Sequence, residues 1–195
     1  MALTGSALLV AGLWIPAKAW IAQQMIARAW HATLAGQERV RPWPWADTWP
    51  IAKLELPGAS RPLYVLAGAS GQSLAFGPAH LSTSGLPGDA DNVVIAGHRD
   101  THFAALEALD VGDEILVESK RGTIRYRVEA TAIVHESRVD LVERTGRREL
   151  TLITCYPFDA IVPGGPLRYV VFASATVSAT LAKALSGRWA TGDDA

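Results

Sequence analysis

The chain has 195 residues, of which 49% are hydrophobic, enough for one domain with a buried core and an appendage. Its formal net charge of −1 argues against a nucleic-acid partner, because such partners are bound by strongly basic surfaces. A single cysteine, Cys155, excludes an intrachain disulfide; a free thiol facing an oxidising space suggests reactivity.

Residues 1–36 are predicted to form an N-terminal membrane anchor and stalk helix. The first 17 residues carry no charged side chain and residues 7–15 are almost continuously apolar. This pattern is typical of a membrane segment, although a full span needs about 20 residues. Residues 17–19 resemble a cleavage site, but the apolar pattern continues beyond them, which favours an uncleaved anchor. We expect a single-pass inner-membrane protein whose folded domain lies on the periplasmic or extracytoplasmic side.

Residues 37–50 are predicted to be a linker rich in proline and tryptophan. Such a segment forms neither a helix nor a central strand, so the domain boundary is placed near Pro50. The tryptophans are interpreted as an aromatic collar at the membrane surface in preference to an aromatic ligand site.

From residue 51 onward the sequence changes to short strand-like segments separated by glycine, proline and charged turns. The predicted strands are residues 51–56, 62–66, 92–96, 114–118, 123–134, 149–154 and 167–173. Within 123–130 the alternation points Ile124, Tyr126, Val128 and Ala130 inward. Their even spacing predicts an antiparallel sandwich or a closed barrel in place of a parallel α/β sheet. Brief helices are expected at residues 103–109 and 178–185.

Cys155 follows the predicted strand 149–154 and precedes Pro157, which ends the strand by removing a backbone donor. Because side chains alternate along a strand, Cys155 and Thr154 are expected on opposite faces. Thr154 is accordingly interpreted as a packing hydroxyl more than as a catalyst. A lone cysteine is often only a small buried hydrophobe. Catalytic-type residues elsewhere in the chain favour a nucleophile instead.

His98 follows the buried strand 92–96 after Gly97, which is expected to let backbones approach closely. If the two strands bring their ends together, His98 and Cys155 form the proton carrier and nucleophile of a thiol enzyme. His98 and His102 are also four residues apart, as in some zinc helices. However, Arg99 stands where such a helix carries glutamate, so neither a metal nor a cofactor is predicted.

Arg168 lies on the predicted strand 167–173, thirteen residues after the cysteine. In one interpretation it is an edge-strand charge that reaches water along its aliphatic stem. In the other, a hairpin through residues 163–166 returns it alongside Cys155, where its fork of donors stabilises a thiolate, a carbonyl or an oxyanion.

Together these residues resemble the sortases, which are membrane-anchored cysteine transpeptidases. Gly97-His98, the Thr-Leu-x-Thr-Cys run of residues 151–155, and Arg168 match the three signature positions in order. Residues 77–80 and 87–92 also look like the family's approach to the histidine strand. The tryptophan-rich N-terminus and the Thr-Cys-Tyr-Pro-Phe run are most similar to class GN sortases of Gram-negative, often marine, proteobacteria.

The resemblance implies an all-β fold: an eight-stranded closed barrel with short helices over residues 51–177, followed by a C-terminal helix or tail at 178–195. It implies that Cys155 attacks the threonine carbonyl of a Leu-Pro-x-Thr-Gly-like sorting signal, that His98 protonates the leaving amine and that Arg168 stabilises the oxyanion. The substrate is then expected to contact Thr154, Ala96, Gly97 and Tyr156.

The expected partner is a substrate protein with a C-terminal sorting signal. In class GN this is a dedicated protein with inter-alpha-trypsin-inhibitor-like (VIT) and von Willebrand A domains. The amine acceptor is not defined by the sequence. Two alternatives stay open: a thiol hydrolase that uses water, and a membrane-tethered β-domain that binds a partner and keeps an inert cysteine. Some sortases bind calcium, but Asp110, Asp113 and Glu114 are interpreted as a solvated turn.

Overall fold

The computed structural model describes residues 2–162 and 164–176, with side chains from residue 17 onward. The elements are α1 (Ala2–Leu34), β1 (Pro50–Glu55), β2 (Leu63–Ala67), α2 (Gly71–Phe76), β3 (Ala79–His80), β4 (Asn92–Ala96), η1 (Ala104–Ala108), β5 (Glu114–Ser119), β6 (Gly122–His135), η2 (Val139–Val142), β7 (Glu149–Cys155) and β8 (Leu167–Ala175). η1 and η2 are 3₁₀ helices. The helix expected at 178–185 lies outside the described residues.

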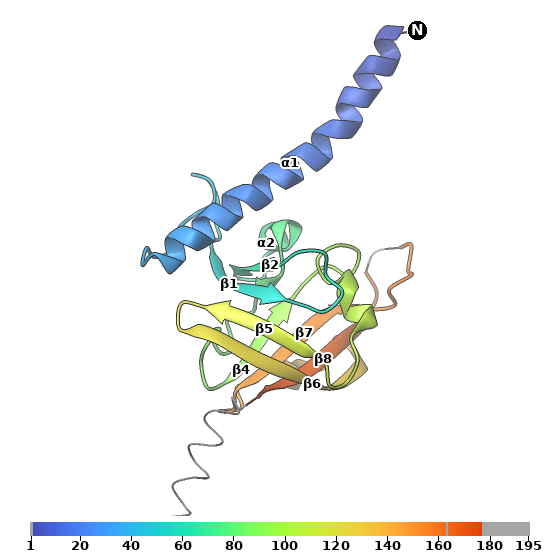
Figure 1. Ribbon diagram of the computed structural model, residues 1–195. Helices are drawn as coiled ribbons and strands as arrows, with labels where there is room; N and C mark the ends of the chain where they lie inside the picture. Colours follow the sequence, from blue (N-terminus) through green and yellow to red (C-terminus); the bar gives the residue numbers. More distant parts are fainter. Residues whose placement is uncertain (1, 163, 177–195) are drawn as a thin grey trace, which may run out of the picture.

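The strands close into a barrel in the order β1-β2-β3-β4-β7-β8-β6-β5, as Figure 1 shows. This confirms the predicted all-β closed barrel. Most neighbouring strands pair antiparallel, but β2 pairs with β3, and β4 with β7, in parallel. A parallel pair needs a crossover connection, and here α2 lies between β2 and β3 while the β5–β6 hairpin lies between β4 and β7.

Alternating burial along β1 and β5 gives the barrel its apolar interior. On β6, Tyr126 and Val128 point inward as predicted, and Ile124 is partly buried against the core. Ala130, however, is exposed. The register of β6 against β8 shifts between Val128 and Ala130, and one extra residue transfers the next side chain to the outer face.

β3 and α2 are not among the predicted elements. β3 has only 2 residues, too few for an alternating pattern. α2 has 6 residues and is preceded by Ser70, whose hydroxyl accepts a hydrogen bond from the backbone N–H of Ser73 at 3.2 Å. A serine at this position is a favoured N-cap and was the available signal for this helix.

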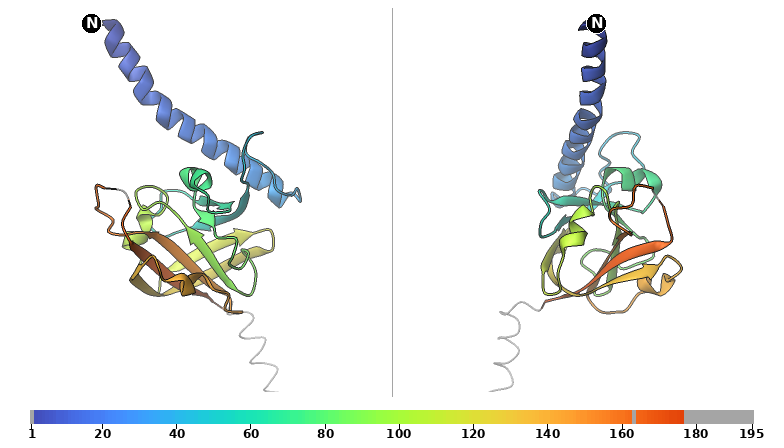
Figure 2. Two further views of the ribbon diagram at one scale, coloured as in Figure 1. Left: turned by 180° about the vertical axis from the view of Figure 1, so that it is seen from behind. Right: turned by 90° about the vertical axis from the view of Figure 1, so that its right-hand side faces the viewer.

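The C-terminal half of α1 packs on the barrel beside β1 and α2, while its other half extends away from the barrel in each view (Figures 1 and 2). Ile26 and Trp30 are each 1% exposed. The side-chain amide of Gln23 donates to the backbone carbonyl of Phe76 at 2.6 Å. These contacts fix the helix end against the domain.

Within the described residues, no helix combines the length and apolar character needed to cross a membrane. The N-terminal membrane anchor therefore stays a prediction. In the linker, the Trp43 ring meets Phe76 edge-on at a centroid distance of 4.8 Å, so this tryptophan contacts the protein. Trp20 and Trp45 are exposed, whereas Trp30 is buried, and the aromatic collar stays a prediction.

Candidate active site

The parallel pairing of β4 and β7 places the ends of these strands at the same edge of the barrel. Ala96 lies opposite Ile153, and the N–H of Gly97 donates to the carbonyl of Ile153 at 3.1 Å. His98 comes two residues after Ala96, and Cys155 two residues after Ile153. The register therefore carries His98 and Cys155 to neighbouring positions at the rim.

The antiparallel strand β8 brings Arg168 to the other side of the cysteine. Cys155 and Arg168 are direct Cα partners. Side chains of directly opposed residues lie on one face of the sheet, with Cβ atoms about 5 Å apart. Cys155 and Arg168 are half-buried and His98 is exposed, so the set is accessible from solvent. The arrangement thus brings the predicted nucleophile, acid and anion-stabilising group together at strand ends.

The guanidinium of Arg168 is held by a carboxylate that the sequence did not reveal. Its Nη2 donates to Oε2 of Glu136 at 2.5 Å, and Nη1 donates to the carbonyls of Gly165 and Leu167 at 2.7 and 2.9 Å. The side chain is 26% exposed. Without a bound substrate, the Arg168 guanidinium is directed to Glu136. To stabilise an oxyanion, one of its N–H groups has to turn toward that oxyanion.

At position 97 only glycine fits, because an aromatic ring occupies the space of a side chain. The sequence had suggested a close approach of backbones instead. A Cβ added at Gly97 would lie 2.7 Å from ring atoms of Phe103, closer than real contacts allow. The Phe103 ring is fully buried, and its backbone N–H donates to the carbonyl of His98 at 3.0 Å. The ring and this hydrogen bond together fix the turn that carries His98.

The residues predicted to contact substrate occupy two different environments. Thr154 is 2% exposed, and its hydroxyl donates to the carbonyl of Gly97 at 2.7 Å. It therefore ties β7 to the end of β4 on the face away from Cys155, as the alternation predicts. Gly97 is also buried, whereas Ala96 and Tyr156 are half-buried. Contact of these four residues with substrate stays a prediction.

An aromatic cluster follows the cysteine. Tyr156 stacks on Tyr169 with ring centroids 6.5 Å apart, and the Phe158 ring meets Tyr169 edge-on at 5.2 Å. Phe158 and Tyr169 were not identified from the sequence. The signal was available in the spacing, because Tyr156 and Phe158 flank Pro157 directly after the nucleophile, and Tyr169 follows Arg168. The cluster borders the rim that carries Cys155 and Arg168.

His102 is distinguished from His98 by its surroundings. Burial lowers the pKa of His102, and the nearby positive charges of Arg61 and His98 lower it further. The lowered pKa leaves less of the imidazolium form of His102, so this histidine is poorly suited to donate a proton. The acid role of His98 stays a prediction. His102 also lines a cavity of about 370 Å³ together with Arg61 and Thr101. A larger cavity of about 600 Å³ lies away from the cysteine, where α1 and the linker meet the barrel.

The acidic side chains after η1 are occupied by local partners. Glu114 pairs with Arg125 and Arg127, and the Asp113 carboxylate accepts the backbone N–H of Asp110 at 3.0 Å. In the part of the chain that the structure describes, no three His, Cys, Asp or Glu side chains gather as a metal site would require.

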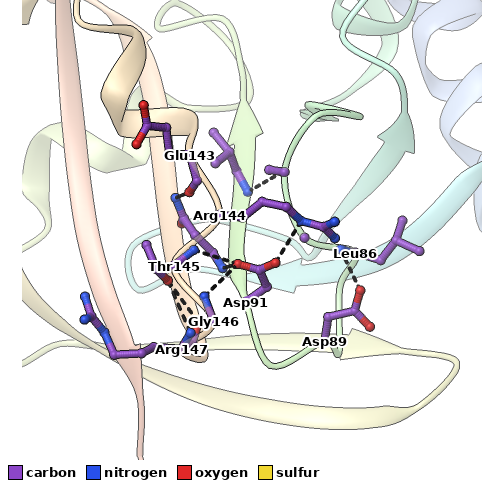
Figure 3. Close-up of polar contacts among 12 residues, drawn as sticks. Leu86, Asp89, Asp91, Glu143, Arg144, Thr145, Gly146 and Arg147 are labelled. Carbon is purple, nitrogen blue, oxygen red and sulfur yellow. Dashed lines mark hydrogen bonds and ion pairs between the residues drawn. The ribbon is translucent and has the colours of Figure 1, made fainter.

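The start of β4 is tied to the β6–β7 connection through Asp91 (Figure 3). Its carboxylate accepts the backbone N–H groups of Asn92, Thr145 and Gly146 at 2.9, 2.8 and 3.2 Å and pairs with Arg144 at 2.8 Å. Partial removal from water raises the pKa of Asp91, but these hydrogen bonds and the guanidinium outweigh it and lower the pKa on balance.

We expect Asp91→Asn to lower the thermal stability of the protein at pH 7 and to lose this effect in acid. Because the pKa of Asp91 is lowered in the folded state, its stabilisation is present above the unfolded value of 3.8 and disappears as the pH falls through the folded value. Melting temperatures of both proteins between pH 7 and pH 3 test this, with the exposed Glu107→Gln as control. A difference that stays constant into acid would contradict it.

The fold brings Cys155, His98 and Arg168 to three neighbouring strand ends of a closed β-barrel. A family model described as the sortase domain matches residues 54–176. The chain belongs to the sortase family.

Individual relatives support the same assignment. The chain is 31% identical over 120 residues to sortase D of Bacillus subtilis (strain 168), covering 61% of this chain and 60% of that protein. It is 29% identical over 125 residues to sortase A of Bacillus anthracis, covering 62% and 57% of the two chains. The chain thus spans about 60% of the length of these curated relatives.

Solved structures share the barrel. Sortase A from Corynebacterium diphtheriae superposes with a TM-score of 0.60 at 28% identity, covering 68% of this chain and 63% of that one. Sortase C-1 from Actinomyces oris superposes with a TM-score of 0.58 at 27% identity, covering 66% and 75%.

Proposed function

We propose that this chain is a cysteine transpeptidase that cleaves a Leu-Pro-x-Thr-Gly-like sorting signal near the C-terminus of a substrate protein. The observation that carries the proposal is the strand register, which places Cys155 between His98 and Arg168 at an accessible rim. Family membership supports the same reaction class.

The chemistry follows from these positions. The Cys155 thiolate attacks the threonine carbonyl carbon, and the carbonyl electrons move onto oxygen beside the Arg168 guanidinium. The oxyanion then collapses, the peptide bond to glycine breaks, and the His98 imidazolium gives its proton to the departing amine. A thioester joins the substrate to Cys155. An incoming amine gives its proton to His98, forms the new amide and releases the thiolate.

The proposal is tested by intact mass measurement of the full chain after incubation with a Leu-Pro-x-Thr-Gly peptide, with and without an added amine. A thioester adduct that turns into an amine-joined product supports the transpeptidase. Release of free acid at a rate independent of the amine would instead identify a thiol hydrolase. A folded protein that forms no adduct and resists mild alkylation of Cys155 would support the binding-module alternative.

Replacing Arg168 with alanine is expected to lower kcat/KM for the peptide by about 10²-fold, because one donor set for the oxyanion is lost. Lysine at this position should recover only part of the rate, since an ammonium does not reproduce the planar fork. Steady-state kinetics of the two variants check this. Glu136→Gln serves as the matched control, because it frees the guanidinium from its carboxylate partner and should retain activity. Wild-type kcat/KM in Arg168→Ala would contradict the role of Arg168 in stabilising the oxyanion.

The partner and location belong to the same proposal. We infer a class GN type of enzyme, anchored in the inner membrane by residues 1–36, that acts on a single substrate protein with VIT and von Willebrand A domains. The resemblance of residues 154–158 and the tryptophan-rich N-terminus supports this assignment. Fractionation of cells expressing the chain tests the anchor: recovery in the salt-washed membrane supports it, and recovery in the soluble fraction refutes it.

A further inference from the structure

Arg99 follows the candidate acid His98 directly, yet its side chain is buried, with 3% of it exposed. Nη1 donates to the carbonyl of Pro157 at 2.7 Å, and Nη2 donates to those of Ala160 and Val162 at 2.8 and 3.4 Å. A buried guanidinium is costly unless its donors are satisfied. Here Nε donates to the exposed carboxylate of Asp100 at 3.1 Å, and the other acceptors come from the connection between β7 and β8.

The described residues of this connection, 156–162 and 164–166, lie between Cys155 and the strand that carries Arg168. It lies beside the segment that follows β4 in Figure 1, where it is drawn in orange. The carbonyls on both sides of Ile161 turn inward to Arg99. The side chain of Ile161 is accordingly 98% exposed. The guanidinium therefore determines which side of the loop faces the protein.

We propose that Arg99 is a positioning residue that fastens the β7–β8 loop to the His98 strand end and so fixes this loop beside Cys155, where the sorting peptide is proposed to bind. The inference rests on the proposed function, because it assigns the loop a role in peptide binding. A loop held in place before binding spares the substrate the entropy cost of ordering it. Arg99 also links this loop to the proposed acid His98, because the two residues are neighbours in the chain.

The geometry explains why an arginine is needed. Three carbonyls in different directions are reached by one planar fork with fixed donor angles. A lysine ammonium is a point charge that can meet only part of this set. Methionine would fill much of the volume and supply no donor. The fastening of the loop is therefore expected to weaken in steps, from arginine through lysine to methionine at position 99.

The test compares Arg99→Lys, Arg99→Met and the control Arg127→Met in the full chain. Arg127 lies on β6, 56% exposed, and pairs with Glu114. In Arg99→Met, amide hydrogen exchange in peptides covering 156–162 should accelerate by at least about tenfold, while β4 and β7 keep their protection. kcat/KM for the sorting peptide should fall by about 10²-fold, with KM rising. Arg99→Lys should be intermediate, and Arg127→Met should match wild type in both measurements.

Unchanged exchange of the loop in a folded Arg99→Met protein would overturn the proposal. Faster exchange with wild-type kcat/KM and KM would also overturn it, because Arg99 would then be structural only. If Arg99→Met does not fold, Arg99→Lys decides by the same two readouts. Should wild type form no acyl-enzyme with any sorting peptide, the proposed function fails, while the exchange measurement still reports on the fastening of the loop.

Discussion

Cys155→Ala should form no thioester adduct with a sorting peptide, and its transpeptidation rate should fall by at least about 10⁴-fold. The reason is that the covalent intermediate needs a sulfur nucleophile, and Cys155 is the only cysteine in the chain. Intact mass after incubation and product formation with an added amine measure the two steps. The half-buried position of the thiol predicts that alanine leaves the barrel folded.

A melting curve of Cys155→Ala provides the control for folding, and Cys155→Ser distinguishes loss of sulfur from loss of a polar group. A serine hydroxyl is a much weaker nucleophile than a thiolate unless a strong base lies beside it. Cys155→Ser should therefore be nearly as inactive as Cys155→Ala. Persistent product formation by Cys155→Ala would place the nucleophile on another residue and refute the mechanism.

His98→Gln should lower the rate of peptide-bond cleavage by about 10³-fold, since the amine departs poorly without a proton. Steady-state rates of peptide cleavage by the wild type and the variant check this expectation. His102→Gln is the matched control, because burial lowers the pKa of that histidine, and its loss should be far smaller.

The leaving group gives a sharper test of the same role. If the scissile amide is replaced by an ester, the alkoxide departs with less need of a proton, so His98→Gln should acylate nearly as fast as wild type. The Arg168→Ala variant should stay slow on the ester, because the oxyanion forms with either substrate. An ester that gives His98→Gln no advantage over the amide would contradict proton donation by His98.

The sequence predicted the barrel well where alternation is local. β4 was predicted with the bounds that the structure shows, since residues 93–96 form a continuous apolar run directly after Asn92. β3 was missed, and so were both parallel pairs, because parallel pairing depends on contacts between distant segments that no local pattern encodes. Ala130 was assigned to the wrong face for a related reason: a bulge is visible only once β6 is aligned with β8.

The site shows the same division. Cys155, His98 and Arg168 could be identified from the sequence because each lies at the end or the beginning of a predicted strand. The partners of these groups depend on side-chain directions in irregular connections. Glu136 lies just beyond β6, and Arg99 reaches a loop 58 or more residues away in the chain. Neither contact has a spacing that could be recognised before the fold was known.

The insertion of β7 between β4 and β8 also bears on how the enzyme becomes active during folding. The hydrogen bond between Thr154 and Gly97 joins positions 57 residues apart, so closing this pair carries a high loop-closure cost. The β7–β8 hairpin by itself sets Arg168 opposite Cys155, but the thiol has no imidazole beside it until β7 docks against β4. The three side chains therefore come together only when the barrel closes.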